Sequence, residues 1–140
     1  RIDDVAENVF VKPGRINSTW GGGLVDMVRA TRLLEIIVED DLLENTRARG
    51  AELLAGLEAI QARHPVVDNA RGKGLLCAFD LPDTATRDAT IKRCFADGML
   101  VLACGTRSIR FRPALNVEAD VIAEALRRLE KAIAEVSRPS

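Results

Sequence analysis

The chain has 140 residues, enough for one domain with a buried core, and its 47% hydrophobic content is not that of a disordered tail. Acidic and basic side chains are interleaved and the formal net charge is −1, so neither a nucleic-acid surface nor a polybasic membrane patch is expected. No apolar run approaches the ~20 residues of a transmembrane helix, and residues 1–10 lack the apolar segment of a signal peptide.

Cysteine and histidine usage points to a reducing, cytoplasmic setting. The three cysteines, Cys77, Cys94 and Cys104, are widely spaced and form no CxxC pair, and His64 is the only histidine. We therefore expect neither a disulfide framework nor a Cys/His zinc site, and no metal. His64 stands where a helical pattern ends, so it is interpreted as a cap or surface residue.

The first part of the chain predicts an arm and two long helices. Residues 1–16 are typical of an irregular or short-strand arm, and because residue 1 is Arg rather than Met, we expect a cleavage product or a piece of a longer protein. Apolar residues recur at helical spacing from Leu24 until the acidic run 39–41, and again from Leu42 to about Arg63. Pro65 then ends the second helix.

After residue 65 the apolar period changes from helical to strand-like. The pattern predicts a short strand, a Gly-rich turn, a strand over 75–81, a helix from Asp83 or Thr84 to about Asp97, buried strands over 99–103 and 108–112, and a helix over 117–136. Val121, Leu126, Leu129 and Ile133 are expected to face inward. The predicted fold class is α/β: a small mixed or antiparallel sheet covered by helices and preceded by long connector helices.

Most catalytic patterns are missing from the sequence. There is no GxSxG elbow, no Walker motif, and no third glycine at dinucleotide spacing after Gly72 and Gly74. Paired carboxylates such as Asp40-Asp41 are sequence neighbours and are interpreted as solvated. Hydrolase, nucleotide-binding and paired-carboxylate chemistry therefore have no support in the residues.

Two features remain as candidate sites. Asn17, Ser18 and Thr19 precede three glycines at a helix start, where free N–H groups and the helix dipole favour an anion. A simple helix cap explains the same residues, and chemistry alone favours it slightly. Arg110 and Arg112 share one face of a predicted strand, where they could grip a carboxylate or simply face solvent, and periodicity cannot choose between these.

The stretch "NSTWGG" at 17–22, the run "DMVR" at 26–29, "RGKGLLCAFDLP" and "SIRFRPAL" occur together in this order. They resemble the segment that follows the active-site lysine in class-III, ornithine-type aminotransferases, which depend on pyridoxal 5'-phosphate (PLP). The resemblance covers essentially the whole chain and is strongest to the branch that acts on L-lysine. It implies the C-terminal small domain of a fold-type-I transferase at 64–140, connector helices at 24–63, and the end of the large PLP-binding domain at 1–23.

The resemblance also implies roles for single residues. Thr19, helped by Ser18 and Asn17, would bind the PLP phosphate of the neighbouring subunit in a homodimer. Arg110 matches the arginine that grips the substrate α-carboxylate, whereas Arg112 has no such counterpart. The implied reaction passes the ε-amino group of L-lysine to 2-oxoglutarate, giving 2-aminoadipate 6-semialdehyde and glutamate, a step of lysine catabolism.

Two departures from the family pattern qualify these roles. Gly23 stands where the family usually has Asn. The Schiff-base lysine would lie upstream of residue 1, and the four lysines Lys12, Lys73, Lys92 and Lys131 all lie outside its motif. We therefore expect no catalytic residue in this chain, and no transamination by the chain alone.

Other readings of the sequence stay open at this point. Ornithine and 4-aminobutyrate aminotransferases share the same C-terminal plan. Residues 66–140 alone resemble a non-catalytic amino-acid-binding regulatory module. A structural, dimerising piece would instead expose the apolar surface of the helices at 24–63.

Overall fold

The computed structural model describes residues 4–8, 11 and 19–137, which fall into two compact units, Arg1–Ile37 and Val38–Ser140. Most of the predicted arm over residues 1–16 lies outside the described residues. No helix in the described part is both long and apolar enough to cross a membrane.

The first unit contains most of helix α1, Leu24–Glu39. The helix follows a turn in which Gly22 has φ 76°, and its first backbone bond runs from the Met27 N–H to the Gly23 carbonyl. It ends before Asp41, whose left-handed φ of 49° interrupts the helical backbone, as the acidic run predicted. None of the residues of α1 is buried in this chain. Seven of its large apolar side chains are exposed: Leu24, Val25, Met27, Val28, Leu33, Leu34 and Val38.

Helix α2, Leu42–Arg63, belongs to the second unit and matches its predicted range. It ends at His64, which is extended because the next residue is Pro65, and the His64 N–H donates to the Ile60 carbonyl at 2.9 Å. Leu53, Leu57 and Ile60 are buried against the rest of the unit. The expectation grouped α2 with α1 as a connector, but α2 is part of the core.

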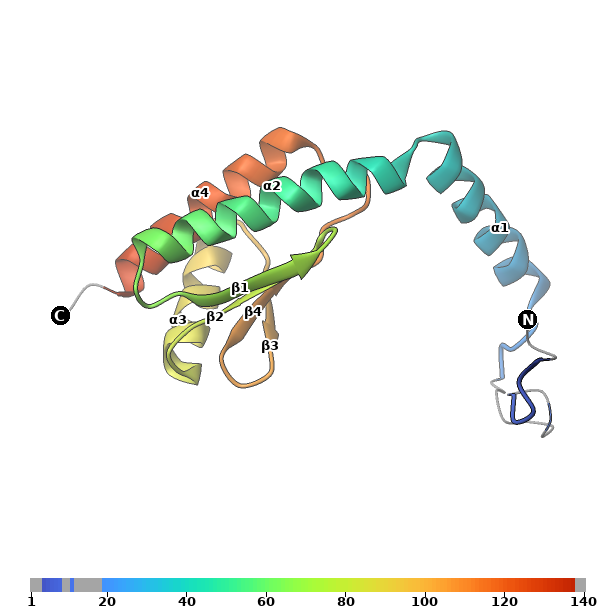
Figure 1. Cartoon of the computed structure of the whole chain (residues 1–140), viewed down its shortest axis with the longest axis horizontal. Coiled ribbons are helices and arrows are strands. Elements are labelled where there is room, and N and C mark those ends of the chain that lie inside the picture. Colours follow the sequence, from blue (N-terminus) through green and yellow to red (C-terminus); the bar gives the residue numbers. More distant parts are fainter. Residues whose placement is uncertain (1–3, 9–10, 12–18, 138–140) are drawn as a thin grey trace. The chain divides into compact units, whose positions relative to one another are not determined.

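Four antiparallel strands form the sheet in the order β1-β2-β4-β3 (Figure 1). They are β1 (Asp68–Lys73), β2 (Leu76–Asp80), β3 (Leu102–Cys104) and β4 (Ser108–Phe111), with α3 (Thr84–Ala96) after β2 and α4 (Ala119–Val136) at the end. This is the predicted β-β-α-β-β-α order. Helix α2 contacts β1 and β2, helix α3 contacts β3 and β4, and both contact α4, so the helices form a layer over the sheet.

The predicted helix ends of α3 are confirmed. The Asp83 carboxylate accepts a hydrogen bond from the Thr86 N–H at 2.7 Å, which caps the first turn. Gly98, just after the helix, has φ 77°, the left-handed conformation that glycine adopts most easily.

The two faces of the sheet differ in chemistry. Cys77, Phe79, Ile109 and Phe111 are buried in the core together with residues of the helices. The predicted alternation along β4 is thus confirmed, with Ile109 and Phe111 inward. The alternate positions of β2 and β4 form the second face of the sheet, which carries the exposed Leu76, the small Ala78 and the polar Asp80, Ser108 and Arg110 and holds the candidate site.

Two sequence predictions about burial are wrong. The strand predicted over 99–103 is only Leu102–Cys104, and Leu102 is 43% exposed because β3 is an edge strand paired with β4 alone. In α4, Ile122 rather than Val121 is buried, since the inward stripe is shifted by one position at the start of the helix. Leu129 and Ile133 are buried as predicted, and Leu126 is partly buried.

Candidate functional site

Arg110 lies in the middle of the second face of the sheet. On β4 it is paired with Ala78 of β2 on one side and with Leu102 of β3 on the other. Its Nε is buried and has no hydrogen-bond partner among the described residues. A buried guanidinium N–H without a partner is costly, and a carboxylate is the group that best satisfies it. The position thus suits an anionic ligand.

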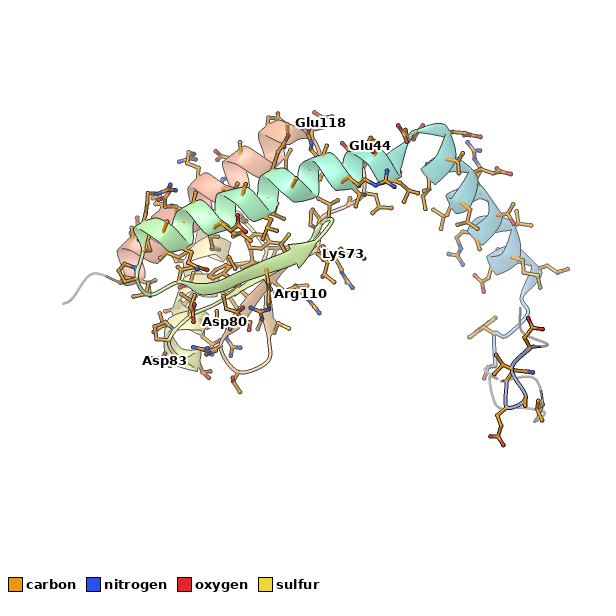
Figure 2. All side chains as sticks on the ribbon, in the orientation of Figure 1. Glu44, Lys73, Asp80, Asp83, Arg110 and Glu118 are labelled. Atoms are coloured by element: carbon orange, nitrogen blue, oxygen red, sulfur yellow. The ribbon has the colours of Figure 1, made fainter. Side chains whose placement is uncertain are left out.

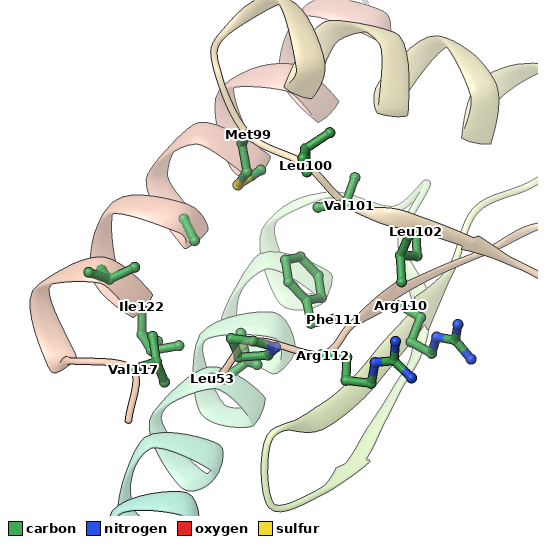
Figure 3. Close-up of a pocket in the computed structure, with 13 residues that line it drawn as sticks. Leu53, Met99, Leu100, Val101, Leu102, Arg110, Phe111, Arg112, Val117 and Ile122 are labelled. Carbon is green, nitrogen blue, oxygen red and sulfur yellow. The ribbon is translucent and has the colours of Figure 1, made fainter. Parts of the chain in front are cut away.

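A pocket of about 360 Å³ lies beside Arg110, between the segment 99–102, the end of β4 and the first part of α4. Its lining is mostly aliphatic, including Leu53, Val101 and Ile122. Arg110 and Arg112 supply its basic groups, and Figure 3 shows their guanidinium groups on the same side of the pocket. The predicted placement of the two arginines together is confirmed, although β4 ends at Phe111, one residue before Arg112.

Asp80 forms a hydrogen-bonded cluster on the same face. Its carboxylate accepts from Ser108 Oγ at 2.5 Å, from Asn69 Nδ2 at 2.9 Å and from Arg71 Nη1 at 3.0 Å, and Arg107 Nη2 lies 3.6 Å away. Burial disfavours the charged carboxylate, but the hydrogen bonds from Ser108, Asn69 and Arg71 outweigh it and lower the pKa of Asp80 to about 2. Asp80 is therefore ionised throughout the neutral range.

The sequence interpretation missed this cluster. Asp80 lies within the predicted strand 75–81, two residues from Ala78 and thus on the face of Arg110. An acidic residue inside an apolar strand was the available signal. Its partners Arg71 and Ser108 come from different strands, and only the pairing register brings them together.

The second candidate site is the start of α1, in the first unit. Thr19 is exposed and lies in the turn before the helix, whereas Asn17 and Ser18 lie outside the described residues. The first N–H groups of a helix lack partners within it, so this end favours an anion. Asp26 adds a negative charge in the first turn, and Arg29 pairs with it.

Gly23 occupies the cap position of α1. A Cβ built there would lie 3.4 Å from an Asp26 carboxylate oxygen and 3.4 Å from the Trp20 carbonyl, and its φ is not in the left-handed region. The asparagine usual in the family would therefore fit. Glycine leaves the helix start without a side-chain cap and keeps the approach to the N–H groups open.

The start of α1 and the lysine side chains are the groups that bear on cofactor binding. A hydroxyl at Thr19 beside a helix N-terminus suits a phosphate group. Lys73, Lys92 and Lys131 all lie in the second unit, on a hairpin strand or on helices, while Lys12 is outside the described residues. Within the described ranges no three His, Cys, Asp or Glu side chains could jointly hold a metal ion.

The histidine and the cysteines lie in surroundings that do not suggest a catalytic role. His64 Nε2 lies 3.2 Å from Glu130 Oε1, a carboxylate that also pairs with Arg63, which confirms the interpretation of His64 as a helix-end residue. The three cysteines are free. Burial raises the pKa of the Cys77 thiol, and that of Cys94 rises to about 11, so neither thiol is activated as a nucleophile.

Comparison with known proteins identifies the family. The profile of the family "Aminotransferase class-III" matches residues 3–133. The chain is 52% identical over 136 residues to L-lysine-epsilon aminotransferase of Amycolatopsis lactamdurans, covering 96% of this chain and 30% of that protein. It is 36% identical over 124 residues to mitochondrial 4-aminobutyrate aminotransferase of Sus scrofa, covering 80% of this chain and 25% of that protein.

Solved structures agree with the sequence comparison. A lysine aminotransferase from M. tuberculosis is 44% identical and superposes with a TM-score of 0.85, over 96% of this chain and 31% of that one. The chain belongs to the class-III aminotransferase family, and its fold is that of the C-terminal portion of fold-type-I aminotransferases. It spans about 30% of the length of the lysine aminotransferases it matches.

Proposed function

We propose that the protein containing this chain is a PLP-dependent L-lysine 6-aminotransferase. It transfers the ε-amino group of L-lysine to 2-oxoglutarate and yields 2-aminoadipate 6-semialdehyde and glutamate. Relatives that are named as lysine aminotransferases and cover almost the whole chain support this choice of donor. We further propose a cytoplasmic homodimer that serves lysine catabolism.

The observation that carries the proposal is the unpartnered Arg110. Its Nε is buried and lacks a hydrogen bond among the described residues, on a sheet face beside a pocket. Both L-lysine and 2-oxoglutarate carry an α-carboxylate, which a guanidinium binds through two parallel hydrogen bonds. Arg110 would thus bind a substrate carboxylate.

The start of α1 would contribute to cofactor binding. PLP supplies an electron sink for the carbon that exchanges its amino group. Thr19, with Ser18 and Asn17, would hold the phosphate of the PLP bound by the neighbouring subunit, and the helix N-terminus would favour its charge. The Schiff-base lysine would come from the large domain, whose last part we propose is residues 1–23. Helix α2 would move with the small domain, since it is part of that core.

A second candidate is a related class-III enzyme with another amine donor. The similarity to 4-aminobutyrate aminotransferase covers 80% of the chain, so the C-terminal region alone does not define the donor. Ornithine and 4-aminobutyrate are the alternative donors. A non-catalytic amino-acid-binding module is a weaker candidate, because it leaves the match over residues 3–23 without a role.

A donor panel tests the proposal. The full-length protein, saturated with PLP, is incubated with 2-oxoglutarate and with L-lysine, L-ornithine or 4-aminobutyrate, and glutamate is measured. We expect kcat/KM to be highest for L-lysine. A preference for another donor would support the second candidate, and no glutamate with any donor would reject the aminotransferase function.

A further inference from the structure

We propose that Arg71 and Asp80 form a positioning pair that keeps Arg110 free for substrate. Arg71, with Ser108 and Asn69, holds the Asp80 carboxylate so that it does not neutralise Arg110. The inference rests on the proposed function, because it assumes that Arg110 binds a substrate carboxylate. It assigns a role to two residues that do not touch the substrate.

The sheet register places Asp80 within reach of Arg110. Asp80 is opposite Ser108, and Ala78 is opposite Arg110, so Asp80 and Arg110 are diagonal neighbours on one face of the β2–β4 pair. Diagonal neighbours in an antiparallel pair are roughly 7–8 Å apart, which long side chains can span. Figure 2 labels both residues on the sheet. An ion pair between them is therefore geometrically accessible.

In the structure that ion pair is not made. Oδ1 of Asp80 accepts from Ser108 Oγ and Arg71 Nη1, while Oδ2 accepts from Asn69 Nδ2 and lies 3.6 Å from Arg107 Nη2. Both oxygens of the carboxylate are thus occupied. No salt bridge joins Asp80 to Arg110 among the residues that the structure describes, and the Nε of Arg110 remains without a partner.

Arg71 is placed to determine whether Asp80 pairs with it or with Arg110. It lies opposite Ala78 on β1, so a single cross-strand row holds Arg71, Ala78 and Arg110. Its guanidinium also donates to the Asn69 carbonyl at 2.8 Å and to Ser108 Oγ at 3.3 Å, which fixes its position. Without Arg71, Oδ1 would lose its cationic partner, and Arg110 is the arginine on the opposite side of Ala78 in this row. Arg107 approaches the other oxygen, Oδ2, at 3.6 Å.

The test uses the full-length holoenzyme and glutarate, which has the two carboxylates of 2-oxoglutarate but no keto group and cannot react. Binding is measured by calorimetry. Arg71→Met should weaken glutarate binding about fivefold or more, since Asp80 then competes for Arg110. Adding Asp80→Asn to this variant should bring the dissociation constant back to within about twofold of the unmodified enzyme. Lys73→Met, two residues along the same strand and face, controls for the loss of one positive charge.

Non-additivity separates the proposal from a general charge effect. If only long-range charge mattered, Asp80→Asn would tighten binding equally with or without Arg71, and Arg71→Met would resemble Lys73→Met. Either result, or a double variant that stays weak, would overturn the inference. A crystal structure of Arg71→Met gives a readout that is independent of activity: we expect Asp80 within 4 Å of Arg110, the usual ion-pair distance.

The inference and the proposed function can fail separately. If the enzyme transaminates and Arg110→Ala abolishes glutarate binding while Arg71→Met does not change it, only the inference is wrong. If the enzyme does not transaminate, the function is wrong, and the Asp80–Arg110 distance in Arg71→Met still decides whether Arg71 holds the carboxylate.

Discussion

Helices α1 and α2 are both long and rich in apolar residues, yet they differ in burial. Of the 22 residues of α2, four are buried, and three of these, Leu53, Leu57 and Ile60, join the strands and α4 in one core. None of the 16 residues of α1 is buried in this chain, and its apolar side chains are exposed. Apolar periodicity therefore predicts a helix but not the surface against which it packs. One helix stabilises the domain, whereas the other presents a surface that this chain does not cover.

Core truncation should give the largest effect and the clearest contrast between the two helical regions. Phe79→Ala removes a fully buried ring and should lower the free energy of unfolding by about 3–5 kcal/mol. Leu34→Ala on α1, where the side chain is 64% exposed, should cost under about 0.5 kcal/mol in the 140-residue chain. Urea denaturation of both variants measures this. A comparable loss for Leu34→Ala would mean that α1 is buried in solution.

Arg110→Ala tests the candidate site on the well-packed unit. In the full-length enzyme the change should cost on the order of 2–5 kcal/mol in binding both L-lysine and 2-oxoglutarate, because a desolvated charge pair is lost. Arg112→Ala, one residue past the strand, is the matched control and should have a smaller effect. Kinetics with both substrates left unchanged by Arg110→Ala would show that the carboxylate binds elsewhere.

Acid stability tests the polar cluster on the same unit. The pKa of Asp80 is about 2 in the folded chain and near 3.8 ordinarily, so its ionised form stabilises the fold above about pH 4. That contribution, roughly 2 kcal/mol, should be lost as the pH falls from about 4 to 2. Unfolding of the native chain and of Asp80→Asn, followed from pH 2 to 5, should converge at low pH. Parallel curves would contradict the role given to this carboxylate.

Thr19→Ala tests the candidate site on the less packed unit. Loss of one hydrogen bond to a charged phosphate is worth about 1.5–3 kcal/mol, so PLP should dissociate faster from the full-length enzyme on dialysis. Thr31→Ala on α1, whose hydroxyl donates to the Met27 carbonyl, is the matched control. Equal PLP retention in both variants would mean that Thr19 does not bind the phosphate and only belongs to the turn before α1.

Local patterns predicted much of the fold. Proline after His64, the cap at Asp83 and the alternation at Ile109 and Phe111 each act within a few residues, and all were found as expected. The edge position of β3 was not predictable, because strand order depends on pairing between distant segments.

The candidate site was likewise predicted only in part from the sequence. Alternation placed Arg110 and Arg112 on one face, and only the family resemblance singled out Arg110 as the predicted carboxylate-binding residue. The hold of Arg71 on Asp80 was missed because it depends on the register of three strands.

The most direct measurement compares glutamate formation from L-lysine and 2-oxoglutarate by the full-length protein and by residues 1–140 alone, both with excess PLP. We predict turnover by the full-length protein and none by the isolated chain, which carries Arg110 and Thr19 but no lysine in the Schiff-base motif. Equal turnover by the isolated chain, or no lysine-dependent turnover by the full-length protein, would contradict this view of the chain as one part of a lysine aminotransferase.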